Sequence, residues 1–293
     1  MKNINDIINK KYNTTLGINY FHELLKNKYP TMKINENNVE TLKVEEIRQK
    51  EFLQHGYTGI YYAKDNTIKI LTELDENLLS QLDESEFNKD TIINTFLHEY
   101  IHMCTSNVAL DNTVYEGINI RTSQGQNSFF VGLNEGITQM ITDDLMGIKS
   151  DAYVFETNIA KQLSLILGQD NLISIYCSGN PQNILDGINN LNSGVDALEL
   201  IQKIYIMHSM CQGAKIEGAE NIGTEIQKSL ITLYQHSNQN NDEEFYKLTI
   251  NQNNINGMVS KLPIRINSMR DIGFENIGSI ELPNKGDEYN GKK

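Results

Sequence analysis

The sequence predicts an α+β protein, with a small mixed β-sheet in the N-terminal half and an all-helical C-terminal half. Short runs rich in β-branched and aromatic residues occur between about residues 57 and 131. Segments with apolar residues at helical spacing lie on both sides of them, and nearly every pattern after residue 150 is helical. We therefore expect one lobe over 1–149, a helical lobe over 150–280, and a polar, disordered tail over 281–293.

The first fifty residues show three helical patterns. Apolar residues recur three and four positions apart in Asp6–Tyr12 and in Tyr20–Lys28, and the second helix should end at Tyr29-Pro30. Val44–Gln54 is a third amphipathic candidate.

Two β-hairpins follow. In the first, residues 57–63 and 68–71 flank a polar turn, and in the second, residues 117–122 and 127–131 do the same. The acidic segment Leu71–Glu86 between them should be a loop with a short helix.

Two central helices border the second hairpin. The first runs from Asp90, a plausible N-cap, to Met103, and the second runs from an Asn134 cap to Met146 and stops at Gly147. The C-terminal half should add further helices at Tyr153–Leu167, Asn171–Cys177, Pro181–Leu191, Ala197–Met210, Glu217–His236 and Glu243–Asn253.

Composition narrows the classes of partner. The 293 residues carry 25 Lys and Arg against 38 Asp and Glu, a net charge of −13, without a dense basic cluster. This balance argues against nucleic acid and anionic membranes as partners. No transmembrane run or signal peptide is recognised, and the three cysteines Cys104, Cys177 and Cys211 form no disulfide framework, so we expect a cytoplasmic protein. The composition carries no indication of the oligomeric state.

The most informative motif is HExxH, formed by His98-Glu99-Tyr100-Ile101-His102. Four residues make about one helical turn, so both imidazoles project from one face and can bind one metal ion. Glu99 lies beside that face, where its carboxylate can reach a metal-bound water. The sequence therefore predicts a catalytic metal site on the first central helix.

A third protein ligand is needed, because catalytic zinc usually has three. The positions at which metzincins place their extra Gly and His hold Thr105 and Val108, and no further histidine lies within 100 residues after His102. The third ligand should therefore be a carboxylate.

Glu135 is the preferred third ligand among the carboxylates. It stands near the start of the second central helix, in the stretch Gly132-Leu-Asn-Glu-Gly. The glycines on both sides of it permit the helix to approach the metal closely. Glu116 and Glu156 are the alternatives, and Asp111 is a more distant one.

These motifs together resemble those of the gluzincins, the thermolysin-like zinc metallopeptidases. HEYIH followed by a helix opening Leu-Asn-Glu-Gly-Ile-Thr is most similar to the small, soluble bacterial members with an Asn-Glu-Gly-x-Thr zinc helix. The resemblance covers about residues 57–147. It implies a zincin-like N-terminal lobe with two zinc-bearing helices, one zinc per chain held by His98, His102 and Glu135, and Glu99 as the general base.

One position departs from the pattern of that superfamily. Four residues after the glutamate ligand, an acidic residue often orients a ligand histidine, and this sequence has Gln139 there. The amide oxygen can still accept the hydrogen bond, and Asp143 is the other candidate for this partner.

The resemblance implies a zinc metalloendopeptidase that acts on a peptide or protein. A Tyr or His should stabilise the tetrahedral oxyanion, and Tyr115, Tyr153 and His208 are the candidates. The hairpin at 57–71 should offer the strand edge along which substrate pairs. The alternatives are a non-catalytic zinc-binding or interaction module, and a dedicated regulatory protease or toxin with one protein target, delivered by a non-classical route if it leaves the cell.

Overall fold

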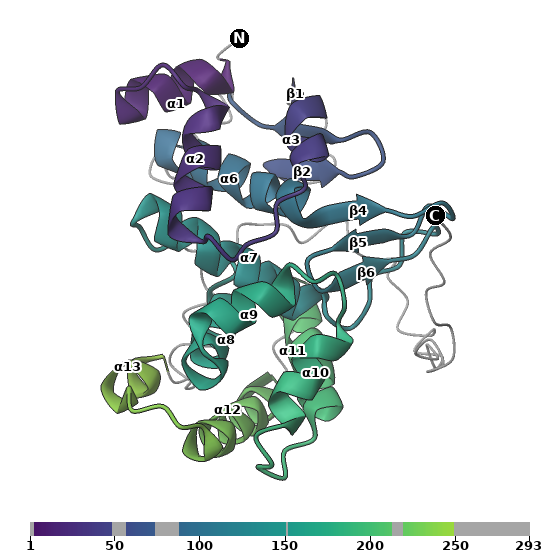
Figure 1. The fold of residues 1–293 in the computed structure, drawn as a ribbon, viewed down its shortest axis with the longest axis vertical. Helices are drawn as coiled ribbons and strands as arrows, with labels where there is room; N and C mark the ends of the chain where they lie inside the picture. The colour runs from purple at the N-terminus through teal and green to yellow at the C-terminus, as the bar shows by residue number, and fades with distance from the viewer. Residues whose placement is uncertain (1–2, 49–56, 74–87, 151, 213–218, 249–293) are drawn as a thin grey trace.

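The structure, a computed structural model, describes residues 3–48, 57–73, 88–150, 152–212 and 219–248. The fold is mixed α+β, as expected. N-terminal helices and two small sheets surround two central helices, and helices alone make up the described chain after residue 150 (Figure 1). None of the described helices combines the length and apolarity needed to cross a bilayer.

The first sheet is small and mixed, as the sequence predicts. It consists of β1 (Lys43–Glu46), β2 (Gly59–Tyr62) and β3 (Thr67–Ile70) in the order β1-β3-β2. β2 and β3 form the expected antiparallel hairpin, whereas β1 pairs with β3 in parallel. β2 is therefore an edge strand of this sheet within the described chain.

The helix expected over Val44–Gln54 is wrong where the structure describes it. A short helix, α3 (Glu36–Thr41), precedes this segment, and β1 then occupies its first residues. The segment was amphipathic by local spacing, but pairing with β3, more than twenty residues away, decides its conformation. Residues 49–54 lie outside the described chain.

Helix α6 (Lys89–Thr105) carries the HExxH motif. Its N-cap is Asn88, whose side chain accepts hydrogen bonds from the backbone N–H groups of Asp90 and Thr91. The cap expected at Asp90 is thus wrong by two residues, and Asp90 instead places a negative charge in the first turn, where it favours the helix dipole.

The C-terminal end of α6 is held by the N-terminal segment. Asn35 Nδ2 donates to Ser106 O, and Asn38 Nδ2 donates to Met103 O and Ser106 O. Met103 O also accepts from the backbone N–H of the C-cap residue Ser106, so the asparagines add side-chain donors to the carbonyls at the end of the helix. Helices α1 (Ile4–Tyr12) and α2 (Ile18–Lys28), close to their predicted positions, pack on the central helices from the same side (Figure 1).

The second sheet differs from the predicted hairpin. Its strands β4 (Ser106–Val108), β5 (Val114–Glu116) and β6 (Asn119–Arg121) are antiparallel and follow α6 directly. The turn between β5 and β6 is at Gly117, whose φ of 57° permits it, and the predicted turn at residues 123–126 is also present, where the N–H of Gly125 donates to Thr122 O. Residues 127–131 contribute only an isolated bridge before α7 begins, so the second predicted strand is wrong.

Helix α7 (Val131–Met146) starts earlier than predicted and ends at Gly147, as predicted. Asn134 is not its N-cap. It is fully buried inside the helix, and its side-chain oxygen accepts from the N–H of Ile118 in the turn of the second sheet. Asn134, which the sequence predicts to cap its own helix, therefore binds a backbone N–H of the second sheet instead.

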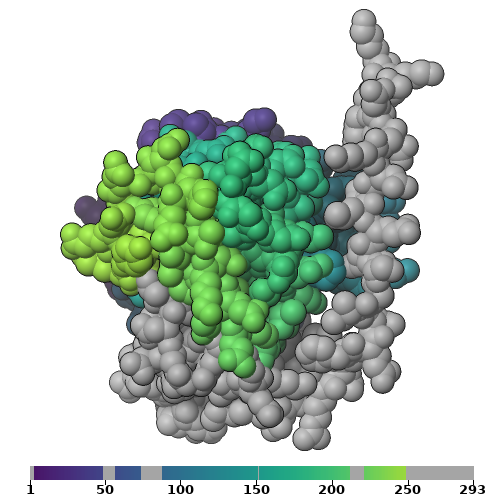
Figure 2. Space-filling model, turned by 90° about the horizontal axis from the view of Figure 1, so that it is seen from below, coloured from purple at the N-terminus to yellow at the C-terminus, as the bar shows by residue number. Residues whose placement is uncertain are grey.

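The remaining helices close one face of the core. They are α8 (Val154–Leu167), α9 (Gln169–Tyr176), α10 (Gln182–Asn189), α11 (Ala197–Gln212), α12 (Ala219–His236) and α13 (Asp242–Lys247). Figure 2 shows the surface that the later ones form, in green to yellow. α8 lies close on α7 because residue 136 is glycine: a Cβ there would be 2.3 Å from the backbone oxygen of Glu156. The predicted tail over 281–293 lies outside the described residues.

Candidate metal centre

Helices α6 and α7 bring three side chains to one point. His98 Nε2 lies 3.0 Å from His102 Nε2 and 3.0 Å from Glu135 Oε2, and His102 Nε2 lies 3.3 Å from the same carboxylate oxygen. Both histidines are buried, and Glu135 is partly accessible. These three residues form a group that could hold a metal ion.

The outer nitrogens of the two imidazoles are already engaged. His98 Nδ1 is 2.9 Å from Gln139 Oε1, which can only accept, so Nδ1 carries the hydrogen. His102 Nδ1 is 2.7 Å from Glu116 Oε1, in an ion-pair contact rather than an aligned hydrogen bond. A neutral histidine protonated on Nδ1 has its lone pair on Nε2. If both histidines are neutral with hydrogen on Nδ1, two lone pairs and a carboxylate oxygen face one another, and a cation bound between them would resolve the repulsion.

The electrostatics of the group also favour positive charge. Burial raises the pKa of the Glu135 carboxyl, but the adjacent histidines outweigh this and hold it well below its usual range. Burial lowers the pKa of His102, but Glu116 and Glu135 more than compensate and raise it well above its usual value. The chemistry of these side chains thus suits a bound cation.

Gln139 and Asp143, the two residues expected to orient a ligand histidine, are not alternatives but belong to one hydrogen-bonded chain. Gln139 accepts the hydrogen bond from His98 Nδ1, as the sequence predicts. Asp143 does not bind a histidine. Its Oδ1 accepts from Gln139 Nε2 at 2.8 Å.

Glu116, one of the alternative third ligands in the sequence, lies on the other side of the His102 ring. It contacts Nδ1, and its second oxygen lies 3.7 Å from Arg121 Nη2. Sequence reasoning missed this role because it placed the hairpin too late in the chain. β4 follows the helix at Ser106, and Ser106 pairs with Glu116, which returns this carboxylate to the helix end.

The other two carboxylate candidates lie elsewhere. Glu156 is buried on α8 and accepts from His208 Nδ1 at 2.8 Å. Asp111 is exposed in the turn between β4 and β5, where it accepts from Thr113. Neither belongs to the group of three.

Glu99 lies next to His98 and against the edge strand of the first sheet. A Cβ built on Gly59 of β2 would lie 3.2 Å from Glu99 Cγ. Desolvation raises the pKa of the Glu99 carboxyl, while His98 and His102 oppose that rise. A carboxyl with a raised pKa is suited to accept and release a proton near neutral pH.

The two tyrosine candidates are placed differently. The Tyr153 ring stacks on His98, with centroids 5.2 Å apart and planes 14° apart, and it also lies 6.2 Å from the ring of His208. Its backbone is left-handed, with φ of 49°, a strained conformation for an aromatic residue. Tyr115 neighbours Glu116 in β5, and successive strand residues point to opposite faces, so Tyr115 points away from the face that carries Glu116.

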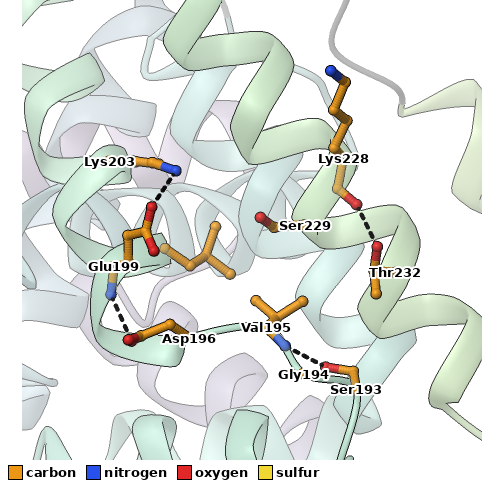
Figure 3. Close-up of a pocket in the computed structure, with 10 residues that line it drawn as sticks. Ser193, Gly194, Val195, Asp196, Glu199, Lys203, Lys228, Ser229 and Thr232 are labelled. Carbon is orange, nitrogen blue, oxygen red and sulfur yellow. Dashed lines mark hydrogen bonds and ion pairs between the residues drawn. The ribbon is translucent and has the colours of Figure 1, made fainter.

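A surface cavity of about 330 Å³ lies away from these residues, at the start of α11 and beside α12 (Figure 3). Its polar groups are largely engaged with one another: Lys203 pairs with Glu199 and Glu225, and Asp196 caps the helix through the N–H of Glu199. This cavity offers no cluster of groups that resembles a reaction site.

No family model matches this chain, and no curated protein and no solved structure matches it. The resemblance to gluzincins therefore rests on the sequence motifs.

Proposed function

We propose that the protein is a zinc-dependent metalloendopeptidase. The observation that carries this proposal is the convergence of His98 Nε2, His102 Nε2 and Glu135 Oε2 within 3.0–3.3 Å of one another. Ligand atoms about 2.0–2.1 Å from a tetrahedral zinc lie roughly 3.3 Å apart, close to this spacing. Two imidazoles and one carboxylate are also a ligand set that zinc hydrolases use, with a fourth position left for water.

A bound zinc would supply a water with a pKa near 7 and would polarise the carbonyl of the peptide bond. The chain's own residues then have separate tasks. Glu99 accepts the proton of the attacking water at its carboxylate and later delivers it to the nitrogen of the leaving amine. Its raised pKa supports both directions of transfer.

Two groups support stabilisation of the developing oxyanion. Burial lowers the pKa of His208, but Glu156 counteracts this and raises that pKa, which favours the form with hydrogen on both nitrogens. Nδ1 is occupied by Glu156, which leaves Nε2–H as a donor. Tyr153 stacks on the rings of both His98 and His208, and its strained backbone supports a functional position.

We further assign the lobe up to residue 149 to a zincin-like fold, with the helices after it as the second wall of the site. β2 is the edge strand beside Glu99, and no described strand pairs with its side opposite β3, which suits an extended peptide that joins the sheet as a further strand. This placement supports a peptide or protein as substrate.

The test combines metal analysis with cleavage of an unbiased peptide library. The wild type should hold one zinc per chain and cleave library peptides. Glu99→Gln should hold the same zinc, because Glu99 is not a ligand, and lose about 10²–10⁴-fold in rate, the range for a general base. His102→Ala is the control that should lose the metal.

Two outcomes would overturn the proposal. A wild type that binds zinc and a stoichiometric protein partner but cleaves nothing would be a binding module. A wild type that cleaves one protein and no library peptide would be a dedicated protease, and the general substrate class would then be wrong.

A further inference from the structure

A chain of buried polar side chains leads from His98 away from the metal position. Gln139 Oε1 accepts from His98 Nδ1 at 2.9 Å, and Gln139 Nε2 donates to Asp143 Oδ1 at 2.8 Å and to Asn94 Oδ1 at 3.2 Å. Asn94, Gln139 and Asp143 are all buried. Because a buried polar group without a partner is costly, each member of this chain restricts the orientation of the next.

The orientation of the Gln139 amide follows from its partners. A carboxylate only accepts hydrogen bonds, so the NH₂ group faces Asp143 and the carbonyl oxygen faces His98. Asn94 supports this orientation, since its Nδ2 faces Met146 Sδ at 3.5 Å and its oxygen is turned to Gln139. A reversed amide would place its oxygen against two acceptors.

The amide orientation in turn selects one form of His98. With an acceptor at 2.9 Å, Nδ1 must carry the hydrogen, which leaves Nε2 unprotonated toward His102 and Glu135. A histidine binds a metal through its unprotonated nitrogen, and the partner of the other nitrogen fixes which one that is.

Asp143 is itself held in place from the end of its helix. The N–H of Ser150 donates to Oδ1 at 3.1 Å, and Lys161 Nζ on α8 lies 3.7 Å from Oδ2. Its neighbour Asp144 has a different role, because it contacts Lys28 at the end of α2 and the C-cap residue Tyr29. The two adjacent aspartates therefore form a matched pair, one behind the metal group and one in a contact with the N-terminal helices.

We propose that Asp143 is a positioning residue for the metal centre: it fixes the amide of Gln139 and thereby selects the form of His98 that binds metal. The proposal rests on the metal site of the proposed function. It adds a residue that acts on a ligand through an intervening side chain.

The test is a double-mutant cycle on zinc affinity, measured by competition with a chelating dye. Asp143→Leu should weaken zinc binding by about 10-fold, the low end for disturbing a partner of a ligand. Asp143→Leu combined with Gln139→Leu should bind no more weakly than Gln139→Leu alone, because Asp143 acts through Gln139. Asp144→Leu should leave zinc affinity unchanged. Additive losses in the double variant, or an unchanged affinity in Asp143→Leu, would overturn the proposal.

Two further measurements separate positioning from folding. Asp143→Asn keeps an oxygen that can accept from Gln139, so zinc affinity should return to near that of the wild type. If Asp143→Leu does not fold, hydrogen exchange of the Gln139 side-chain amide in the zinc-loaded wild type decides. Slow exchange supports the proposal, and exchange as fast as that of an exposed glutamine overturns it. If the wild type does not bind zinc, both the proposed function and this inference are wrong. If the wild type binds zinc and its affinity does not depend on Asp143, only this inference is wrong.

Discussion

Gly59→Ala should disturb the proposed active site from outside it. Gly59 lies on β2 where this edge strand meets α6, and a Cβ there would be 2.4 Å from Thr95 Cγ2 and 3.2 Å from Glu99 Cγ. Ordinary contacts between carbon atoms begin at about 3.4 Å. The strand and the helix must therefore move apart by about 1 Å, since 3.4 minus 2.4 is 1.0.

Two effects of different size follow from this displacement. Overpacking of this kind costs about 1–3 kcal/mol of folding free energy. A shift of about 1 Å in the geometry around reacting groups lowers the rate roughly 100-fold. We expect kcat/KM to fall by about that factor while zinc content stays at the wild-type value, because the three proposed metal ligands lie on α6 and α7 and not on β2.

The assay measures urea unfolding, zinc content and kcat/KM on a peptide identified from the library. Thr95→Ser removes the clashing methyl group and keeps the hydroxyl, so Gly59→Ala with Thr95→Ser should recover most of both losses. Gly187→Ala on α10 is the matched control, since the nearest atom to its new Cβ is 3.4 Å away, and alanine favours a helix.

The reasoning fails if Gly59→Ala matches the wild type in stability and in kcat/KM. It also fails if Thr95→Ser does not rescue, because the damage would then have another origin than the predicted clash.

Further predictions concern the carboxylates around the centre and the buried pair behind it. In a zinc titration, Glu135→Ala should weaken binding by at least about 10-fold and Glu116→Ala by about 10-fold. Glu156→Ala should leave zinc binding nearly unchanged. If Glu156→Ala weakens binding and Glu135→Ala does not, Glu156 is the third ligand. His208→Ala should cost about 3–5 kcal/mol of folding free energy in chemical denaturation, because it leaves the Glu156 carboxylate buried without its partner, and a loss below 1 kcal/mol would contradict this. The pKa of His208 is raised above its ordinary value of 6.5, so the stability it contributes is fully present below pH 6.5 and is lost as the pH rises through the folded pKa. The stability difference between wild type and His208→Gln should therefore shrink as the pH rises above 6.5, and an increase would contradict this argument.

Most of the helices and strands could be predicted from local periodicity in the sequence, and the exceptions can be identified. The central helices, the hairpin of β2 and β3 and the stop at Gly147 follow from helical spacing, turn residues and a left-handed glycine. The predictions failed at Val44, at Asn134 and at residues 127–131. For the first two, contacts with residues distant in the sequence stabilise a structure that local spacing does not predict: β3 pairs with Val44, and the N–H of Ile118 donates to Asn134. Residues 127–131 instead contact residues 119–121 and lead directly into α7.

For the candidate metal ligands too, part of the arrangement follows from the sequence and part only from the tertiary structure. The spacing of His98 and His102 is a property of one helical turn, so the sequence by itself determined that both imidazoles share a face. The position of Glu135 near the start of the next helix made it the preferred partner.

Only the tertiary structure decided that Glu116 contacts His102 and that Asp143 acts on Gln139 and not on a histidine. Glu116 reaches His102 because β5 pairs back onto the strand that follows α6, and Asp143 reaches His98 only through Gln139. Their contacts depend on how a sheet and two helices pack, and that packing is set by burial of the whole core and not by the spacing of any one segment.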